Sequence, residues 1–216
     1  GSFPSVVKAA EAGDIVAADE LGDMYLYGFG VEKSGKQAVF WLEKGAEKGY
    51  WRSLNALGDM YRLGEEVEED GKKALSLYRK AEEMHSREAL TSIGFMYYAG
   101  QGVDFDEGKA FSYFRKAAGA GDLDALFMMG RCYMEGGAVE KDDRKAADCF
   151  KETADRGYPM GMWALGQSYL HGIGVQRDEK KAVALYQKAA GMNLAAAYSA
   201  LAQCYRYGAG VTEDKA

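Results

Sequence analysis

The sequence of 216 residues has little cysteine, proline or histidine, and it has no long apolar run. Its three cysteines exclude the disulfide framework of small secreted domains, because an odd count leaves at least one thiol unpaired. Its two histidines stand far apart with no cysteine pair nearby, so no zinc motif is present. No apolar run approaches the ~18 residues that span a bilayer, and no signal-peptide pattern opens the sequence. We therefore expect no membrane insertion.

The charge balance gives no electrostatic reason to expect a nucleic-acid partner. The sequence has 27 basic and 33 acidic residues, a net charge of -6, and polyanion binding usually needs a basic surface. Its one excess is glycine, with 28 residues beside two prolines, about 13% against a typical ~7%. Such a composition is typical of a turn-rich β protein or of many identical turns, and the positions of the glycines decide between them.

The glycines recur every 36 residues, which is the signature of a tandem repeat. The first column of the repeat holds Gly22, Gly58, Gly94, Gly130, Gly166 and Ala202. A tyrosine follows three residues later, at Tyr25, Tyr61, Tyr97, Tyr133, Tyr169 and Tyr205. A second glycine follows the tyrosine, at Gly28, Gly64, Gly100, Gly136, Gly172 and Gly208. No insertion interrupts this period, so the chain is an array of similar units.

Each unit predicts two helices. In the first helix, Ala17, Leu21, Met24 and Tyr25 follow the i, i+4, i+7, i+8 spacing of a helix and not the alternation of a strand. The second helix should begin after an N-cap, at Ser34, Asp70, Asp106, Asp142, Asp178 and Asp214. It should end at residues that tolerate the left-handed conformation, at Gly13, Gly49, Gly121, Gly157 and Asn193, with His85 as the exception.

Two kinds of glycine position carry further expectations. A glycine inside the first helix, such as Gly22, costs up to ~1 kcal/mol in helix propensity, so we expect a neighbouring helix to approach closely there. Between the helices, Glu66 and Ala138 replace a glycine that other units keep. If that position needs a positive φ, these two loops carry strain of about 1 kcal/mol or adopt another turn.

The unit resembles the Sel1-like repeat family. The pattern is A-x-x-x-L-G-x-x-Y-x-x-G-x-G-V followed by D-x-x-K-A and K-A-A-x-x-G, as in AYSALAQCYRYGAGVTED and LGQSYLHGIGVQRDEKKAVALYQKAAG, and it covers essentially residues 3–216. The resemblance implies an all-α fold, a right-handed α-solenoid (superhelix) of antiparallel helix pairs similar to tetratricopeptide repeats. It also implies an adaptor that holds other proteins, as in bacterial signalling, secretion, host contact and protein quality control.

The repeat predicts the domain boundaries. We expect an expression scar at 1–2, a partial repeat with only its second helix at 3–13, full repeats at 14–49, 50–85, 86–121, 122–157 and 158–193, and a truncated sixth repeat at 194–216. Both ends fall inside a repeat without the polar caps that end a solenoid. We therefore expect a fragment of a longer array, with periplasmic, secreted and cytoplasmic locations all left open. We expect apolar surface around Leu201 and Tyr205 that frays or packs on another molecule, end-to-end self-association included.

The columns that do not repeat predict the partner surface. On a helical wheel, columns 19, 23, 26 and 27 lie opposite the core, and first helices line the concave face of such a solenoid. The predicted partner-binding residues in these columns are Phe95, Tyr98, Phe127, Arg131, Met134, Trp163, Gln167, Leu170 and His171. Aromatic side chains beside arginine are typical of binding hot spots. Two interpretations stay open, contact with a protein or peptide partner and lateral packing between repeats.

The remaining signals indicate structure and not chemistry. No nucleophile, base and orienting group recur together, so the sequence predicts neither an enzyme nor a cofactor. The G-x-G loops follow a helix and not a strand, which excludes a nucleotide loop. Cys132, Cys149 and Cys204 stand in core columns and should be free thiols, with a Cys132–Cys149 bridge as the lesser alternative. The acidic stretch 65–70 should lie in a solvated loop.

These observations predict a scaffold that binds a peptide or protein partner on the concave face of the solenoid. Three alternatives are kept. The first is an inhibitor or immunity-type protein that occludes a toxin or an enzyme. The second is an enzyme that acts on the cell wall, which would need converging carboxylates that the sequence does not show. The third is a structural spacer without a specific partner.

Overall fold

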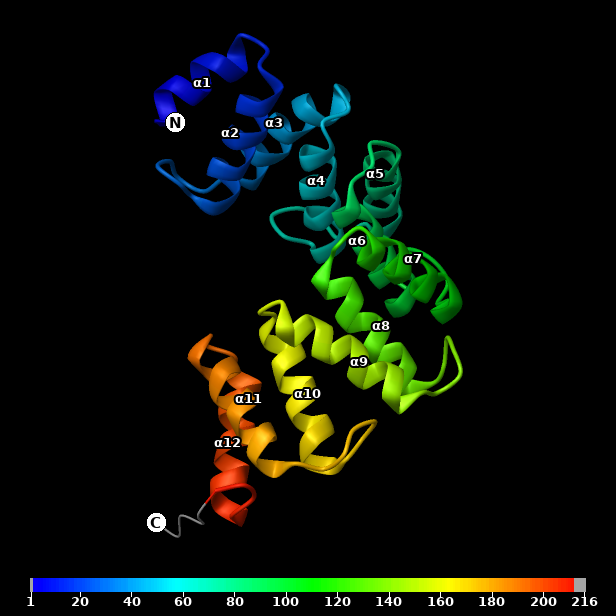
Figure 1. Ribbon diagram of the computed structural model, residues 1–216. Coiled ribbons are helices and arrows are strands. Elements are labelled where there is room, and N and C mark those ends of the chain that lie inside the picture. The colour runs from blue at the N-terminus through cyan, green and yellow to red at the C-terminus, as the bar shows by residue number, and fades with distance from the viewer. Residues whose placement is uncertain (1, 212–216) are drawn as a thin grey trace. The chain divides into compact units, whose positions relative to one another are not determined.

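The computed structural model describes residues 2–211, and this part of the chain is all-helical, with 12 α-helices and no strand (Figure 1). It confirms the predicted all-α array of helix pairs. The chain divides into two compact units, Gly1–Tyr113 and Phe114–Ala216. None of the described helices is long and apolar enough to cross a membrane.

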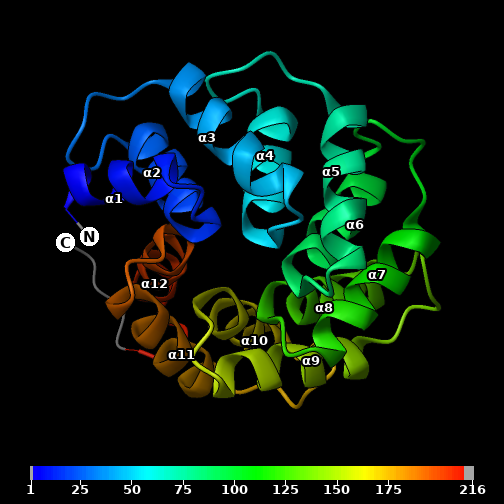
Figure 2. The ribbon, with the colours of Figure 1, turned by 90° about the horizontal axis from the view of Figure 1, so that it is seen from above.

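In the first unit, first and second helices alternate along the chain. The helices are α1 Phe3–Glu11, α2 Ile15–Tyr27, α3 Gly35–Glu47, α4 Trp51–Leu63, α5 Gly71–Glu83 and α6 Arg87–Ala99. First helices have even numbers and second helices odd numbers. Each helix packs on the next, and Figure 2 shows α3 between α2 and α4.

The second unit repeats this arrangement. The division between the units falls inside α7, Glu107–Gly119. The helices that follow are α8 Leu123–Glu135, α9 Asp143–Asp155, α10 Pro159–His171, α11 Glu179–Gly191 and α12 Ala195–Tyr207. Here α9 packs against α8 and α10, and α11 packs against α10 and α12. The same local sequence pattern therefore produces the same helix pair in both units.

The predicted caps of the second helices are confirmed. Each capping side chain accepts a hydrogen bond from the backbone N–H three residues later, at 2.8–3.3 Å, at Ser34, Asp70, Asp106, Asp142 and Asp178. Asp214 lies outside the described residues. Three first helices are capped in the same way, which we did not predict, by Asp14, Ser86 and Asp122. Such caps satisfy N–H groups that have no partner inside the helix.

The predicted helix ends are confirmed as well. Positive φ angles of 63–94° occur at Gly13, Gly49, Gly121, Gly157 and Asn193. His85 adopts the same conformation, with a φ of 60°, so it ends its helix although it is neither glycine nor asparagine. Between the helices, Glu66 has a φ of 62° and carries the expected strain, whereas Ala138 avoids a positive φ because its loop takes another turn.

The glycines inside the first helices lie against large side chains of the second helices. A Cβ atom on Gly58 would lie 2.5 Å from Tyr78 Cε1, and one on Gly130 would lie 2.6 Å from Phe150 Cε1. Real Cβ atoms do not approach other atoms so closely. The helices of a pair can pack at this distance only because the column lacks a side chain, so the expected close approach is confirmed.

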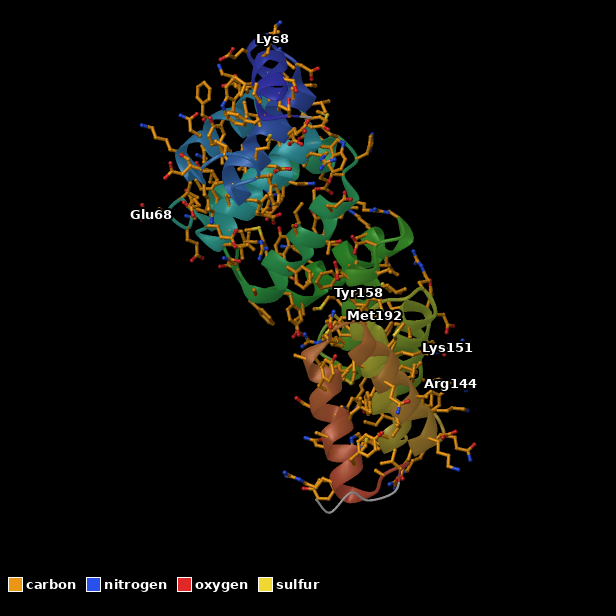
Figure 3. All side chains as sticks on the ribbon, turned by 90° about the vertical axis from the view of Figure 1, so that its left-hand side faces the viewer. Lys8, Glu68, Arg144, Lys151, Tyr158 and Met192 are labelled. Atoms are coloured by element: carbon orange, nitrogen blue, oxygen red, sulfur yellow. The ribbon has the colours of Figure 1, made fainter. Side chains whose placement is uncertain are left out.

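The core runs through each unit between its helices. It includes the fully buried Leu21, Leu42, Leu57, Phe150 and Tyr186. Asp19 is the one charged residue among the buried side chains of the described residues, and in Figure 3 the exposed Lys8, Glu68, Arg144 and Lys151 project away from the ribbon. Glu68 belongs to the acidic loop 65–70, in which Val67 alone is not exposed, as predicted.

The cysteines are three free thiols, so the Cys132–Cys149 bridge does not form. Cys132 and Cys204 are buried and Cys149 is half-buried. Burial raises the pKa of the Cys149 thiol to about 11, helped by the nearby charges of Glu152 and Asp148. These cysteines act as small core residues, as the sequence predicted.

The last helix is fully formed through Tyr207 and leaves large side chains in contact with solvent. Tyr198, Tyr205 and Tyr207 are exposed, whereas Leu201 is half-buried. The expected apolar surface is therefore present around Tyr205, on an ordered and not a frayed helix. Self-association through this surface stays a prediction.

Candidate functional site

Pockets recur at one place in the repeat, between the first helices of neighbouring repeats. In the second unit, a pocket of about 640 Å³ lies between α8 and α10. We call it the apolar pocket, and it is lined by Phe127, Arg131, Met134, Glu135, Phe150, Met160, Trp163, Ala164, Gln167, Ser168, His171 and Ile173. Both first helices contribute, so neither repeat forms this pocket alone.

A second pocket lies one repeat further along the same unit, between α10 and α12. It has a volume of about 330 Å³. We call it the basic pocket, and it is lined by Leu170, His171, Arg177, Gln203, Cys204, Tyr207 and Ala209. Six of these seven residues stand 36 positions after a residue of the apolar pocket, so the two pockets are the same feature in successive repeats.

The first unit has its own version of this pocket, between α2 and α4. It has a volume of about 420 Å³. We call it the acidic pocket, and it is lined by Asp19, Asp23, Leu26, Tyr27, Trp51, Arg52, Asn55, Ala56, Asp59, Met60, Glu65 and Glu88. Ten of these twelve residues stand 108 positions, or three repeats, before a residue of the apolar pocket.

The helical period explains why these pockets share one place. Columns 19, 23, 26 and 27 follow the i, i+4, i+7, i+8 spacing that gathers residues on one face of a helix. The adjoining face carries the glycine column, which is fixed against the second helix, as Gly130 is against Phe150. The outer columns are consequently left to form the walls between one first helix and the next.

Aromatic packing forms the base of the apolar pocket. Phe127 is only 7% exposed, and its ring centroid lies 5.5 Å from that of Phe150 and 5.8 Å from that of Tyr158. For Phe127, lateral packing between repeats is therefore what the structure shows. Met134 stays 37% exposed and Trp163 is half-buried, so apolar surface above this base remains open to solvent.

Polar groups surround this apolar base. Arg131 Nη2 lies 2.7 Å from Glu135 Oε1 one turn along α8. The buried hydroxyl of Ser168 donates to the carbonyl of Ala164 over 3.2 Å, so it presents no unpaired donor to the pocket. His171 is exposed at the last residue of α10. An apolar base with a few polar groups at its edge is the usual anatomy of a site that anchors one side chain.

The structure brings most of the predicted partner-binding residues together. Six of the nine line the apolar pocket: Phe127, Arg131, Met134, Trp163, Gln167 and His171. Leu170 lines the basic pocket, where His171 also takes part. Phe95 and Tyr98 belong to α6 of the first unit and are half-buried, and they form no part of these two pockets. In the second unit, the predicted residues thus line two neighbouring pockets.

Six residues of the apolar pocket are not among the predicted ones: Glu135, Phe150, Met160, Ala164, Ser168 and Ile173. Phe150 comes from a second helix, Ile173 from the following loop, and Met160 from the first turn of α10. The helical wheel selects residues only from the outer columns of the first helices. The column of Leu42, Tyr78 and Phe150 gave a usable signal, because its residues are large and face the glycine column.

The acidic pocket has the same frame and the opposite chemistry. Asp19 stands where the apolar pocket has Phe127, and Asp23 stands where it has Arg131. Asp19 accepts a hydrogen bond from Ser53 Oγ over 2.8 Å and lies 3.5 Å from Arg52 Nε. Burial raises the pKa of Asp19, and burial together with the charge of Asp19 raises the pKa of Asp23.

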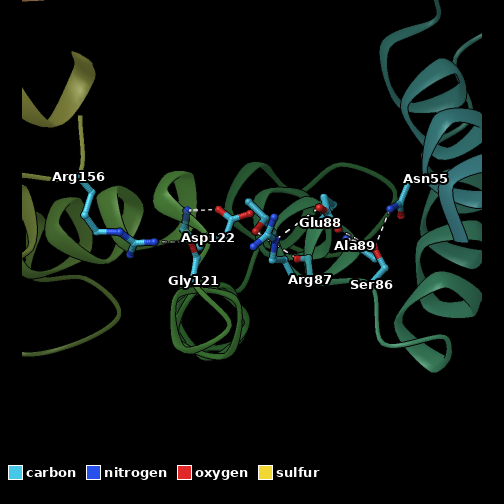
Figure 4. A network of polar contacts seen from close by, with 10 residues as sticks. Asn55, Ser86, Arg87, Glu88, Ala89, Gly121, Asp122 and Arg156 are labelled. Atoms are coloured by element: carbon cyan, nitrogen blue, oxygen red, sulfur yellow. Dashed lines mark hydrogen bonds and ion pairs between the residues drawn. The ribbon is translucent and has the colours of Figure 1, made fainter. Parts of the chain in front are cut away.

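Hydrogen bonds between repeats help to hold the first helices at their spacing. In the first unit, Asn55 Nδ2 donates to Ser86 Oγ over 2.7 Å, and Ser86 Oγ accepts from the Ala89 N–H over 3.2 Å (Figure 4). In the second unit, Arg156 Nη2 donates to the Gly121 carbonyl over 3.0 Å (Figure 4). The Asn55–Ser86 and Arg156–Gly121 bonds bridge consecutive repeats and thereby support the pocket walls.

Metal chemistry has no support in the part of the chain that the structure describes. Within residues 2–211, no group of three or more His, Cys, Asp and Glu side chains is arranged to hold a metal ion. The residues that line the pockets offer apolar contact, hydrogen bonds and charge. Such groups suit recognition of a side chain or a backbone segment.

Two solved structures resemble this chain over most of its length. A Sel1 repeat protein from Oxalobacter formigenes has a TM-score of 0.87 and 31% sequence identity, with 94% of this chain and 84% of that chain covered. A protective antigen of uropathogenic Escherichia coli has a TM-score of 0.81 and 30% identity, with 97% of this chain covered. The chain spans 45% of the length of that antigen.

More distant structures share the fold alone. An immunity protein from Pseudomonas aeruginosa has a TM-score of 0.62 at 21% identity, with 88% of this chain and 70% of that chain covered. No curated protein matches this sequence.

A family model described as Sel1 repeat matches residues 15–50, 51–86, 87–122, 123–158, 159–194 and 195–216. Proteins built from these repeats are generally protein-interaction scaffolds. The repeat period, the helix pairs, the matching structures and the family model agree, and the chain belongs to the Sel1 repeat family.

Proposed function

We propose that this chain is a protein-interaction scaffold that holds a segment of a partner protein, with one bulky apolar side chain of that segment in the apolar pocket. The observation that carries the proposal is the apolar pocket itself, about 640 Å³ between α8 and α10. Phe127, Phe150 and Trp163 supply its apolar lining, and Arg131 and His171 stand among its polar groups.

The exposed part of the pocket is where binding energy is available. Met134 and Trp163 retain solvent-exposed apolar surface, and its burial contributes about 25 cal/mol per Å². Because the base is already packed, the pocket needs little reorganisation to accept a side chain, which lowers the entropic cost of binding. A single buried anchor of this kind typically accounts for about 2–4 kcal/mol.

The immunity-type alternative has weaker support. The immunity proteins from Pseudomonas aeruginosa are only 20–24% identical to this chain, so they support a shared fold and no shared partner. The apolar pocket favours a segment that inserts a side chain, whereas occlusion of a folded toxin needs a broad surface. We therefore place peptide-segment recognition first.

The test is peptide selection followed by binding measurements on matched variants. A randomised twelve-residue peptide library on phage, about three turns if helical, is selected against the immobilised full chain. Selected peptides are then titrated by fluorescence anisotropy. We expect the peptides to share a Leu, Phe, Met or Trp residue. We expect Met134→Glu to weaken their binding at least tenfold, because a charge would enter the apolar wall.

Met192→Glu is the matched control. Met192 is also an exposed methionine at 49%, it follows α11, and it lines none of the three pockets described. Its variant should bind within twofold of the wild type. Selection of peptides without a shared apolar residue, or equal weakening by both variants, would contradict the proposal. Circular dichroism checks that both variants keep the helix content of the wild type.

A further inference from the structure

We propose that the basic pocket binds a carboxylate of the same partner segment, placed about three residues from the apolar anchor. This inference rests on the proposed function, because it names the chemistry of the segment that the apolar pocket would hold. The partner is then a segment with a bulky apolar residue and an aspartate or glutamate at a fixed spacing. Both pockets belong to the second unit.

The first step is the common frame of the two pockets. Met134 corresponds to Leu170 and Gln167 to Gln203, each 36 positions apart. An apolar wall and an amide therefore repeat at the same places. Because the frame is shared, a segment that lies along it meets the two pockets in the same orientation, one repeat after the other.

The second step is the change of chemistry at the other positions. Glu135 of the apolar pocket is replaced by His171 in the basic pocket, and His171 is replaced by Tyr207. Arg177 is added from the loop between α10 and α11. The lining of the basic pocket thus has no Asp or Glu residue, and its guanidinium, phenol and amide groups all carry hydrogen-bond donors.

The third step is the availability of these donors. Arg177 Nη2 lies 2.5 Å from Glu179 Oε1, and the side chain of Arg177 is 65% exposed. Glu179 is also held by the backbone, since its Oε2 accepts from the Gly210 N–H over 2.9 Å. One ion pair uses a fraction of the five N–H donors of a guanidinium. Tyr207, which is 73% exposed, belongs to the same lining and carries a hydroxyl donor.

The fourth step is the distance between the pockets. His171 of α10 lines both pockets, so the pockets lie on either side of this helix. A helix with its side chains is about 10–12 Å across, and an extended chain advances about 3.3 Å per residue. One repeat along the frame therefore corresponds to about three residues of an extended segment. This spacing predicts an acidic residue two to four positions from the apolar one. Charge-assisted hydrogen bonds from Arg to a carboxylate are stronger than neutral ones, so this contact should add specificity.

The test uses peptides selected against the full chain and a double-mutant cycle. We expect Asp or Glu to be enriched two to four positions from the apolar residue. In the peptide that binds most tightly, replacing the acidic residue by Gln or Asn should weaken binding about tenfold. Arg177→Gln in the protein should weaken binding by a similar factor. The two changes together should weaken binding no more than one of them alone, because they remove the same contact.

Arg144→Gln is the matched control, since Arg144 is an exposed arginine of α9 that lines neither pocket. This variant should bind the selected peptides within twofold of the wild type. An apolar residue without an enriched acidic residue, enrichment of Lys or Arg at that place, or additive losses in the cycle would overturn this inference and leave the proposed function standing. Absence of the apolar residue would overturn the proposed function itself. Binding of a phosphoserine peptide with no binding of the Asp or Glu peptide would also overturn the inference that the basic pocket binds a carboxylate.

Discussion

Two tyrosines in one column of the repeat offer a direct test of how hydrogen bonding shapes the stability of this array. Tyr78 and Tyr186 are both completely buried, and each ring lies against a helix glycine, Gly58 and Gly166. The Tyr78 hydroxyl donates to Asp59 Oδ1 over 2.6 Å and accepts from Arg62 Nε over 3.2 Å. The Tyr186 hydroxyl has no hydrogen-bond partner.

Replacing each tyrosine by phenylalanine should change stability in opposite directions. Tyr78→Phe removes a hydrogen bond to a charged group, which typically contributes about 1.5–3 kcal/mol. Tyr186→Phe removes a buried hydroxyl that is unpaired, and leaving such a group buried costs about 1–3 kcal/mol. The repeat already places phenylalanine in this column at Phe150. We therefore expect Tyr186→Phe to raise the free energy of unfolding by about 1 kcal/mol.

The assay is urea unfolding followed by circular dichroism, with the midpoints compared at equal slope because the slope reports the surface exposed on unfolding. Repeat arrays do not always unfold in one step, so the midpoint of the transition that includes the second unit is the one to compare for Tyr186. A loss of stability in Tyr186→Phe as large as that in Tyr78→Phe would refute the reasoning, since it would show that the Tyr186 hydroxyl makes a favourable bond.

Two further predictions concern the glycine column and the acidic pocket. Gly166→Ala should lower the free energy of unfolding by about 1–3 kcal/mol through overpacking, since its Cβ would lie 2.5 Å from Tyr186 Cε1. Gly191→Ala, where nothing lies within 4 Å, should raise it by up to about 1 kcal/mol in the same urea experiment, and equal effects would contradict the packing argument. The folded pKa of Asp23 is raised, so its ionised form opposes folding; Asp23→Asn should stabilise at pH 7, and the gain should vanish as the pH falls below the unfolded pKa of 3.8. Asp178→Asn should lower the free energy of unfolding at pH 7, because the hydrogen bonds of the N-cap lower the folded pKa of Asp178, and this difference should disappear in unfolding curves measured as the pH falls from 3.8 through that folded pKa.

The 36-residue period determined the secondary structure because its signals are local. An N-cap such as Asp70 bonds to a backbone N–H three residues away, and an end residue such as Gly49 adopts its φ within its own turn. Even the close approach at Gly58 follows from the sequence, since a glycine repeated inside a helix needs a reason in packing. The fold was therefore predictable from one chain. Even the end of α5 before His85, which is neither glycine nor asparagine, followed from the repeat.

The tertiary structure alone decided which outer residues form a site. Each pocket draws on two consecutive repeats, and its depth depends on how side chains of neighbouring helices pack, as with Phe127 on Phe150. A helical wheel treats one helix at a time, so it placed Phe127 and Trp163 on one surface without showing that the first is buried and the second is half-buried. The sequence determined the frame of the pockets because the frame repeats; their depth and chemistry depend on contacts between repeats, which only the packed chain creates.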